Sequence, residues 1–95
     1  MRDAMRVRYR FVGLVQNRGF RYACWKSAEK AGCTGWVRNE RDRSVTAEIQ
    51  GTAEQLAAFM RELARVVYGF GDNWSVGEQR EISPRQDEDS FNIKF

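Results

Sequence analysis

Histidine is absent from this chain of 95 residues, and Cys24 and Cys33 are its only cysteines. Without an imidazole, neither a Ser-His-Asp or Cys-His nucleophilic site nor a histidine-based zinc site can form. The two cysteines lack C-x-x-C spacing, and the further ligands that a two-cysteine zinc site would need are not evident in the sequence. We therefore predict a protein without metal or cofactor, whose chemistry rests on arginine, carboxylates, amides, hydroxyls and backbone N–H groups.

Long apolar runs are also missing, which excludes a membrane-spanning helix. The first ten residues, MRDAMRVRYR, contain no apolar stretch that could serve as a signal peptide. These absences predict a cytoplasmic protein that does not bind membranes. In the cytosol two reduced, half-buried thiols at Cys24 and Cys33 are favoured over a disulfide between them, and the disulfide remains the alternative.

Size and composition indicate one globular domain over residues 1–95, which we expect to be a monomer. With 42% hydrophobic and 31% charged residues and a single proline, the chain can build one two-layer core. The net charge of +3 is uneven: residues 1–51 hold eleven Lys and Arg against five Asp and Glu, whereas residues 52–95 hold five against eight. Thirteen of the sixteen basic residues are arginine, which contacts phosphate or carboxylate with two parallel N–H groups. An anionic partner should therefore meet the first half of the chain.

Residues 6–12 alternate strictly between apolar and basic side chains, which predicts a strand with one buried and one solvated face. The expected core face carries Val7, Tyr9 and Phe11, and the solvated face carries Arg6, Arg8 and Arg10. Such a stripe of arginines can bind RNA, but RNA-binding domains of this type usually expose aromatic side chains on the same face. Because the aromatic residues here share the buried face, we expect no nucleic acid as a partner.

The remaining pattern predicts two helices and four further strands. One helix is expected over residues 20–31 and ends at Gly32, and a second opens at Thr52, which forms a capping-box pattern with Gln55. The expected strands are 34–40, 44–51, 73–82 and 91–95, with a turn at 41–43 and an acidic loop at 83–90. Two helices on one face of a mainly antiparallel sheet would bury both apolar helix faces in one core. We therefore predict an α+β, ferredoxin-like two-layer sandwich of order β-α-β-β-α-β plus a short last strand.

The segment between the first strand and the first helix is a candidate anion site. It reads GLVQNRGFR over residues 13–21 and is bounded by Gly13 and Gly19. Loop amides without strand partners and the positive end of a helix dipole attract an anion, and Arg21 in the first helical turn adds a bidentate guanidinium. The segment lacks both the G-K-[ST] of a Walker A motif and G-x-G-x-x-G, so hydrolysis of nucleoside triphosphates is not expected.

These residues resemble the signature of the acylphosphatase family, G-x-V-Q-G-V-x-F-R. The similarity continues in Ala28, Ala31 and Gly32, in the GWVRN sequence of residues 35–39, and in the closing FNIKF, which resembles the family's F-x-I-R-Y. It covers essentially the whole chain, with the same order of elements.

This resemblance implies a small, metal-free hydrolase that cleaves acyl phosphates into a carboxylate and inorganic phosphate. It assigns binding of the phosphoryl group to Arg21 and positioning of the attacking water to Asn39. It assigns the phosphate-binding loop to Gly13, Val15, Gln16, Asn17, Arg18, Gly19 and Phe20. An acyl phosphate already carries a good leaving group, so positioning and electrostatics suffice and the lack of histidine is no handicap.

Three residues depart from the family pattern. Asn17 stands where glycine is usual, and asparagine is the best substitute if that position needs a positive φ. Arg18 stands where valine is usual and adds charge beside the anion site. Arg43 replaces the glycine common in the turn between the second and third strands, which concerns the turn rather than catalysis. Since Arg21 and Asn39 are retained, we keep the interpretation as an enzyme.

Alternatives to a catalytic role stay open, both for the protein and for single residues. The altered loop would also suit a non-catalytic anion-binding or regulatory module on the same fold, and the arginine stripe would suit an RNA-binding domain. Release of phosphate from a synthetic acyl phosphate without added metal would distinguish the enzyme from the module. Two side chains receive structural roles: Gln16 is expected to brace the loop, and Trp36 to pack in the core.

Overall fold

The computed structural model describes residues 4–16, 19–70 and 73–95 of the chain. Its elements are β1 (Met5–Gly13), α1 (Phe20–Ala31), β2 (Thr34–Asn39), β3 (Val45–Gly51), α2 (Ala53–Val66), the 3₁₀ turn η1 (Val67–Phe70), β4 (Trp74–Ile82) and β5 (Phe91–Lys94). The two helices and five strands thus follow the predicted order, with boundaries close to those expected from the sequence.

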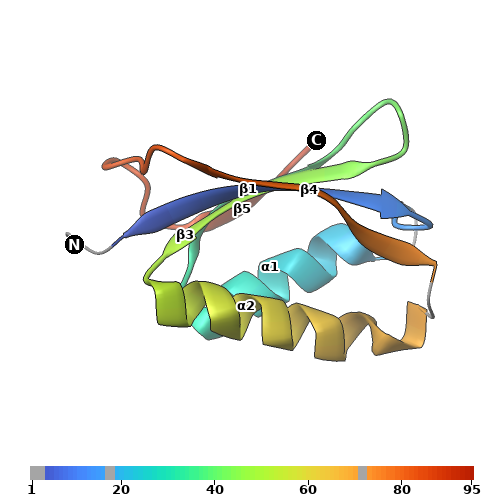
Figure 1. Cartoon of the computed structure of the whole chain (residues 1–95), viewed down its shortest axis with the longest axis horizontal. Coiled ribbons are helices and arrows are strands. Elements are labelled where there is room, and N and C mark those ends of the chain that lie inside the picture. The colour runs from blue at the N-terminus through green and yellow to red at the C-terminus, as the bar shows by residue number, and fades with distance from the viewer. Residues whose placement is uncertain (1–3, 17–18, 71–72) are drawn as a thin grey trace.

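The five strands form one sheet in the order β4-β1-β3-β2-β5. Neighbouring strands are antiparallel except β2 and β5, which are parallel. Both helices cover the same face of the sheet, as Figure 1 shows. This arrangement confirms the predicted ferredoxin-like sandwich. It also brings the ends of β1, β2 and β5 and the start of α1 to one end of the molecule.

The core lies between the sheet and the two helices. The strands contribute Val7, Tyr9, Phe11, Val37, Val45, Ala47 and Ile49, and the helices contribute Phe20, Ala23, Cys24, Ala28, Leu56, Phe59 and Leu63. The predicted inward face of β1 is therefore confirmed. Near the end of β1, the ring of Phe11 lies 5.0 Å from that of Phe20 and 6.2 Å from that of Trp74, centroid to centroid. These aromatic contacts anchor the start of α1 against the sheet.

The helix ends follow the signals predicted from the sequence. Helix α1 stops at Gly32, whose N–H donates to the carbonyl oxygen of Glu29 at 3.2 Å. At the start of α2, the Thr52 hydroxyl accepts from the N–H of Gln55 at 3.1 Å, and the Gln55 side chain accepts from the N–H of Thr52 at 2.8 Å. This is the expected capping box, which satisfies two N–H groups at the helix start. No helix in the described part of the chain is long and apolar enough to cross a membrane.

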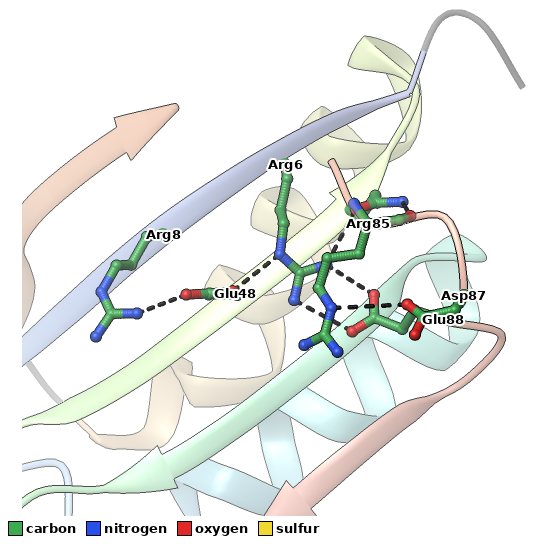
Figure 2. A network of polar contacts seen from close by, with 7 residues as sticks. Arg6, Arg8, Glu48, Arg85, Asp87 and Glu88 are labelled. Atoms are coloured by element: carbon green, nitrogen blue, oxygen red, sulfur yellow. Dashed lines mark hydrogen bonds and ion pairs between the residues drawn. The ribbon is translucent and has the colours of Figure 1, made fainter. Parts of the chain in front are cut away.

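The outer face of the sheet differs from the prediction at Arg6, whose side chain is 0% exposed. The segment between β4 and β5 covers it, and Figure 2 shows Glu48 and Glu88 on either side of its guanidinium. Arg6 Nε donates to Glu48 at 2.9 Å, while Nη1 and Nη2 donate to the two carboxylate oxygens of Glu88 at 2.8 and 3.1 Å. A buried guanidinium is tolerated when carboxylates meet it in this way. The expected solvated stripe is therefore wrong for Arg6, whereas Arg8 and Arg10 stay 36% and 42% exposed.

Glu48 is held between two arginines, because its second carboxylate oxygen accepts from Arg8 at 2.5 Å. Burial by itself would raise the pKa of Glu48, but the guanidinium groups of Arg6 and Arg8 outweigh it and lower that pKa. The contribution of ionised Glu48 to the free energy of unfolding is therefore complete above its ordinary pKa. It is lost as the pH falls through the lowered value of the folded state.

Trp36 is buried, but on the outer face of the sheet rather than in the core. The next residue of β2, Val37, faces the helices, so Trp36 faces the other way. Charged groups surround its ring: the Lys94 ammonium lies 4.6 Å from the ring centroid, and the guanidinium carbons of Arg38 and Arg8 lie at 5.0 and 5.8 Å. The predicted core role is thus wrong, because long cationic side chains bury this indole.

The hairpin between β2 and β3 turns at residues 41–43, as predicted. The Asp42 carboxylate accepts from the hydroxyl and the N–H of Ser44 at 2.5 and 3.0 Å and from Arg10 at 2.7 Å. These bonds, first those from Ser44 and then that from Arg10, hold the pKa of Asp42 well below its usual range. Arg43 has a φ of 75°, and it is the only non-glycine residue with a positive φ among those described. Arginine thus stands in a backbone conformation that favours glycine.

We expect Arg43→Gly to raise the free energy of unfolding by roughly 0.5–1 kcal/mol, because glycine adopts a positive φ without the steric cost of a Cβ atom. Arg41→Gly is the matched control, since it removes the same charge from the same turn at a position without a positive φ. That variant should lose stability. Urea titration of both proteins measures the difference, and equal losses in the two variants would contradict the expectation.

Candidate active site

Strand β1 ends at Gly13, where the chain must pass close to another segment. Gly13 has a φ of 101°, and a Cβ atom built there would lie 2.1 Å from the carbonyl oxygen of Asn73. No other residue type fits this position. The next N–H, that of Leu14, donates to the same Asn73 oxygen at 2.7 Å, and the side chain of Val15 is buried. The start of the predicted anion-binding loop is therefore anchored both by the backbone and by the core.

The loop ends at Gly19, which is also the N-cap residue of α1. Gly19 has the left-handed conformation, with a φ of 81°, and as a glycine it brings no side chain to cap the helix. The first turn of α1 contains no acidic residue either. The partial positive charge of this helix end thus stays available for an anion. Asn17 and Arg18, which the sequence analysis assigned to the loop, lie outside the described residues.

Gln16 connects the loop to the β2–β3 hairpin. Its side-chain amide Nε2 donates to the carbonyl oxygens of Glu40 at 2.8 Å and of Ser44 at 2.9 Å. Both N–H donors of the amide are used in these two bonds. This geometry agrees with the bracing role expected from the sequence, and it fixes the loop relative to Asn39, the residue that precedes the hairpin.

Arg21 lies in the first turn of α1 and extends to the end of β5. Its Nη1 donates to the carbonyl oxygen of Lys94 at 3.3 Å, and its guanidinium carbon lies 4.8 Å from the centroid of the Phe95 ring. A guanidinium has five N–H donors, and among the described residues the structure uses one of those of Arg21. The side chain is therefore held in place while most of its donors remain available for a ligand.

Asn39 is the last residue of β2, and its side-chain oxygen Oδ1 is buried without a hydrogen-bond partner among the described residues. Buried polar atoms nearly always have a partner, and Ser27 Oγ in α1 is the other described side-chain atom without one. Asn39 differs from Ser27 because it lines a pocket. Arg21 and Asn39 line the same pocket, of about 190 Å³. Its other lining residues are Val15, Gly19, Phe20, Tyr22, Ile93 and Phe95. Five predicted site residues thus meet around one cavity, whereas Gly13 and Gln16 do not line it.

One side of this pocket is apolar, and the sequence analysis did not identify it. It consists of Tyr22, Ile93 and Phe95, of which Tyr22 is 56% and Phe95 96% exposed. The alternation in residues 91–95 places Ile93 and Phe95 on one face of a strand, which was the available signal. The alternation does not reveal that β5 pairs in parallel with β2. This pairing brings the face of Ile93 and Phe95 beside α1. The pocket therefore joins the side that carries Arg21 and Asn39 to an apolar wall.

Two other features of the molecule, a second hollow and the two cysteines, are less suitable as the functional site. A larger hollow, of about 430 Å³, lies between α1 and α2 and contains none of the predicted site residues. Cys24 and Cys33 are free, and both are buried rather than half-buried as expected. Burial raises the pKa of Cys24 strongly and that of Cys33 to about 11. Both thiols are thus protonated at neutral pH and are poor nucleophiles.

Comparisons of the sequence and of the fold with known proteins agree with one another. The chain matches the sequence model of the acylphosphatase family over residues 7–93. It is 44% identical over 64 residues to the acylphosphatase of Bifidobacterium longum (67% of this chain, 61% of that protein). It is 32% identical over 89 residues to that of Oceanobacillus iheyensis (94% and 97%). In the first of these relatives the alignment spans less than two thirds of the protein's length. The fold is similar to the crystal structure of acylphosphatase from Bacillus subtilis, with a TM-score of 0.77 at 24% identity over 96% of this chain and 99% of that one.

The bracing geometry of Gln16 predicts a specific effect on stability. Gln16→Glu keeps the size of the side chain but turns a carboxylate oxygen toward two carbonyl oxygens, so we expect the free energy of unfolding to fall by roughly 1–3 kcal/mol. Gln79→Glu makes the same chemical change at an exposed position of β4 and should have almost no effect. Urea unfolding of the two variants provides the measurement. Equal stability of both would mean that the Gln16 contacts contribute nothing.

Proposed function

Because the chain belongs to the acylphosphatase family, we propose that it hydrolyses acyl phosphates to a carboxylate and inorganic phosphate. The observation that carries this proposal is the common pocket of Arg21 and Asn39 at the positive end of α1. The guanidinium supplies charge for a phosphoryl group, and the amide supplies an acceptor for a water molecule. The family's reaction needs these two functions, and neither requires histidine.

In the proposed complex the phosphoryl group lies between the guanidinium of Arg21 and the N–H groups of the loop at the start of α1. Gly13, Gln16 and Gly19 shape this loop, and Val15 and Phe20 fasten it to the core. Asn17 and Arg18 are proposed to complete it. Backbone N–H groups at a helix start and a bidentate guanidinium are both donors that suit the equatorial phosphoryl oxygens. Lys94 and Phe95 hold the guanidinium of Arg21 without any substrate, so little reorganisation of this group would accompany the reaction.

Asn39 is proposed to orient the attacking water. Its Oδ1 would accept a hydrogen bond from the water, so that a lone pair of the water oxygen is directed at phosphorus in line with the acyl oxygen. The new bond forms between the water oxygen and phosphorus, the bond from phosphorus to the acyl oxygen breaks, and its electron pair leaves with the carboxylate. The water's protons remain with the phosphate and the solvent. A carboxylate with a pKa of about 4 needs no general acid to leave.

The apolar wall of the pocket is the proposed binding site of the acyl group. With the phosphoryl group at Arg21, the acyl part of the substrate would extend toward Tyr22, Ile93 and Phe95. These side chains offer apolar surface and no charge, which agrees with a small-molecule acyl phosphate as the substrate. The alternative of a non-catalytic anion-binding or regulatory module has no specific observation in its favour.

The remaining parts of the proposal concern the setting in which the enzyme acts. We propose a cytoplasmic monomer that binds neither membranes nor nucleic acid. Against nucleic acid, Arg6 is neutralised and buried, and Tyr9 and Phe11 lie in the core, so the arginine stripe lacks exposed stacking partners. Buried, free thiols at Cys24 and Cys33 agree with a reducing compartment.

We expect hydrolysis to be independent of metal ions. The chain has no histidine, and the described residues contain no group of three acidic, cysteine or histidine side chains that could hold an ion. After dialysis against excess EDTA, release of phosphate from a synthetic acyl phosphate should be unchanged. Loss of activity that added Mg²⁺ restores would contradict the proposed charge compensation by protein donors.

Three variants separate the proposed roles of the site residues. Arg21→Ala should abolish hydrolysis and greatly weaken inhibition by inorganic phosphate, and Arg21→Lys should not restore both because it lacks the planar fork. Asn39→Ala should reduce kcat on the order of 10²–10³-fold while phosphate still competes with nearly normal affinity, since the water contact matters mainly in the transition state. The measurements are kcat and the phosphate inhibition constant of each variant.

Arg61→Ala is a suitable control, because it removes an arginine from the exposed side of α2, away from the pocket. Near-normal turnover of Arg21→Ala would overturn the assignment of the site. Phosphate binding by the unmodified chain without any hydrolysis would instead favour the non-catalytic module.

A further inference from the structure

The strand that holds Arg21 in place, β5, is short, and it is attached through its pairing with β2 and through Phe91, which is buried in the core, and Ile93, which packs against it. It consists of four residues, Phe91–Lys94, and lies at the edge of the sheet. Among the described strands its only partner is β2, in a parallel pair that runs from Gly35 opposite Phe91 to Arg38 opposite Lys94. One such pair is a weak determinant of where an edge strand lies. The chain that precedes β5 makes a further contribution to its position.

That contribution comes from the segment between β4 and β5. The backbone N–H of Arg85 donates to the Gln50 side-chain oxygen at 2.8 Å, and the Gln50 side-chain nitrogen donates to the Arg85 carbonyl oxygen at 2.7 Å. Three residues further on, Glu88 accepts two hydrogen bonds from Arg6. Arg6 also donates to Gln50 at 3.0 Å, so the glutamine and the ion pair form one network. Figure 2 shows this segment lying along the outer face of the sheet with Glu88 directed at Arg6.

The ion pair of Arg6 and Glu88 is the strongest of these attachments. The side chains are 0% and 11% exposed, so solvent screens the pair little. The two contacts are parallel and bidentate, a geometry that fixes orientation as well as distance. Glu88 stands three residues before β5 begins. The pair thus holds the chain just before it enters the edge strand.

The opposite end of β5 contacts the catalytic arginine. Lys94 supplies the carbonyl oxygen that accepts from Arg21, and Phe95 supplies the ring beside its guanidinium. Four residues of extended chain span about 13 Å. A displacement at the start of so short a strand is transmitted to its end, because a change in register moves every residue of the strand together.

We propose that Arg6 and Glu88 are positioning residues for the active site: their ion pair sets the place of β5, and β5 in turn sets the place of the Arg21 guanidinium. This inference rests on the proposed function, in which Arg21 binds the phosphoryl group. Neither residue contacts the pocket. They act through Lys94 and Phe95, and they affect substrate binding and turnover without touching the substrate.

The test is Glu88→Gln, which keeps the shape of the side chain and one acceptor oxygen but removes the charge that Arg6 faces. Glu48 still pairs with Arg6, which keeps the buried guanidinium from losing all its charge compensation. We expect the inhibition constant of inorganic phosphate to rise roughly threefold to thirtyfold, the range of coupling through packed networks. The NMR signal of the Arg21 Nε–H group should shift in the ligand-free protein. Asp87→Asn is the matched control, because that carboxylate is 83% exposed in the same segment, and it should change neither quantity.

A double-mutant cycle with Phe95→Ala distinguishes positioning from general loss of stability. If both residues act on Arg21 along one path, the increase in the inhibition constant in the double variant will be smaller than the product of the single increases. All measurements are made where circular dichroism shows the variants folded. If Glu88→Gln does not fold, Glu88→Asp, which keeps the charge on a shorter side chain, takes its place with a smaller expected effect.

Two outcomes would overturn the proposal. One is an unchanged inhibition constant and an unchanged Arg21 signal in a less stable Glu88 variant, which would make the ion pair purely structural. The other is an inhibition constant of the double variant that rises by the full product of the increases for Glu88→Gln and Phe95→Ala. Failure of the proposed function looks different, since the unmodified chain would then release no phosphate from an acyl phosphate, whether or not it binds inorganic phosphate. The Arg21 signal would still report whether Glu88 positions the guanidinium.

Discussion

A guanidinium withdrawn from water must be surrounded by acceptors, and the buried side chain of Arg6 imposes this condition on the outer face of the sheet. Strand β3 supplies Glu48 and Gln50, and the segment before β5 supplies Glu88. The helix-covered face is held by apolar contacts, which tolerate changes of shape and composition. The outer face tolerates far less, because an unpaired charge there has no favourable alternative. The position of the chain between β4 and β5, and hence of the edge strand that follows, depends on satisfying this one charge.

The candidate site lies where three segments from different parts of the sequence meet. The loop after β1 and the start of α1 supply Val15, Gly19 and Arg21, the end of β2 supplies Asn39, and the end of β5 supplies the contacts that hold Arg21. Gln16 connects two of these segments through the hairpin. Arg21 and the start of the loop are thus fixed by contacts that do not involve the substrate. For a substrate with a good leaving group, such preorganisation is the main contribution a protein can make.

Local patterns in the sequence predicted most of the fold. The alternation in β1, the capping box of Thr52 and the glycine that ends α1 are signals within a few residues, and the structure confirms each of them. The two errors at Arg6 and Trp36 share one cause. Alternation tells which side chains share a face, but it does not tell what covers that face. A basic residue opposite a core residue was therefore expected in solvent, and a large aromatic residue was expected in the core.

By itself, the sequence determined which chemical groups this protein has for its proposed reaction. It has no histidine, but it has an arginine in the first turn of a helix, an asparagine at the end of a strand and a loop bounded by Gly13 and Gly19. It also determined the order of the elements, since caps and periodicities are local. Only the tertiary structure decided that β5 lies parallel to β2, that Ile93 and Phe95 form a wall beside Arg21, and that Glu88 reaches Arg6. These contacts join residues that are far apart along the chain. They result from the packing of the whole sheet, in which burial and charge pairing are satisfied together, and no local pattern of residues contains that information.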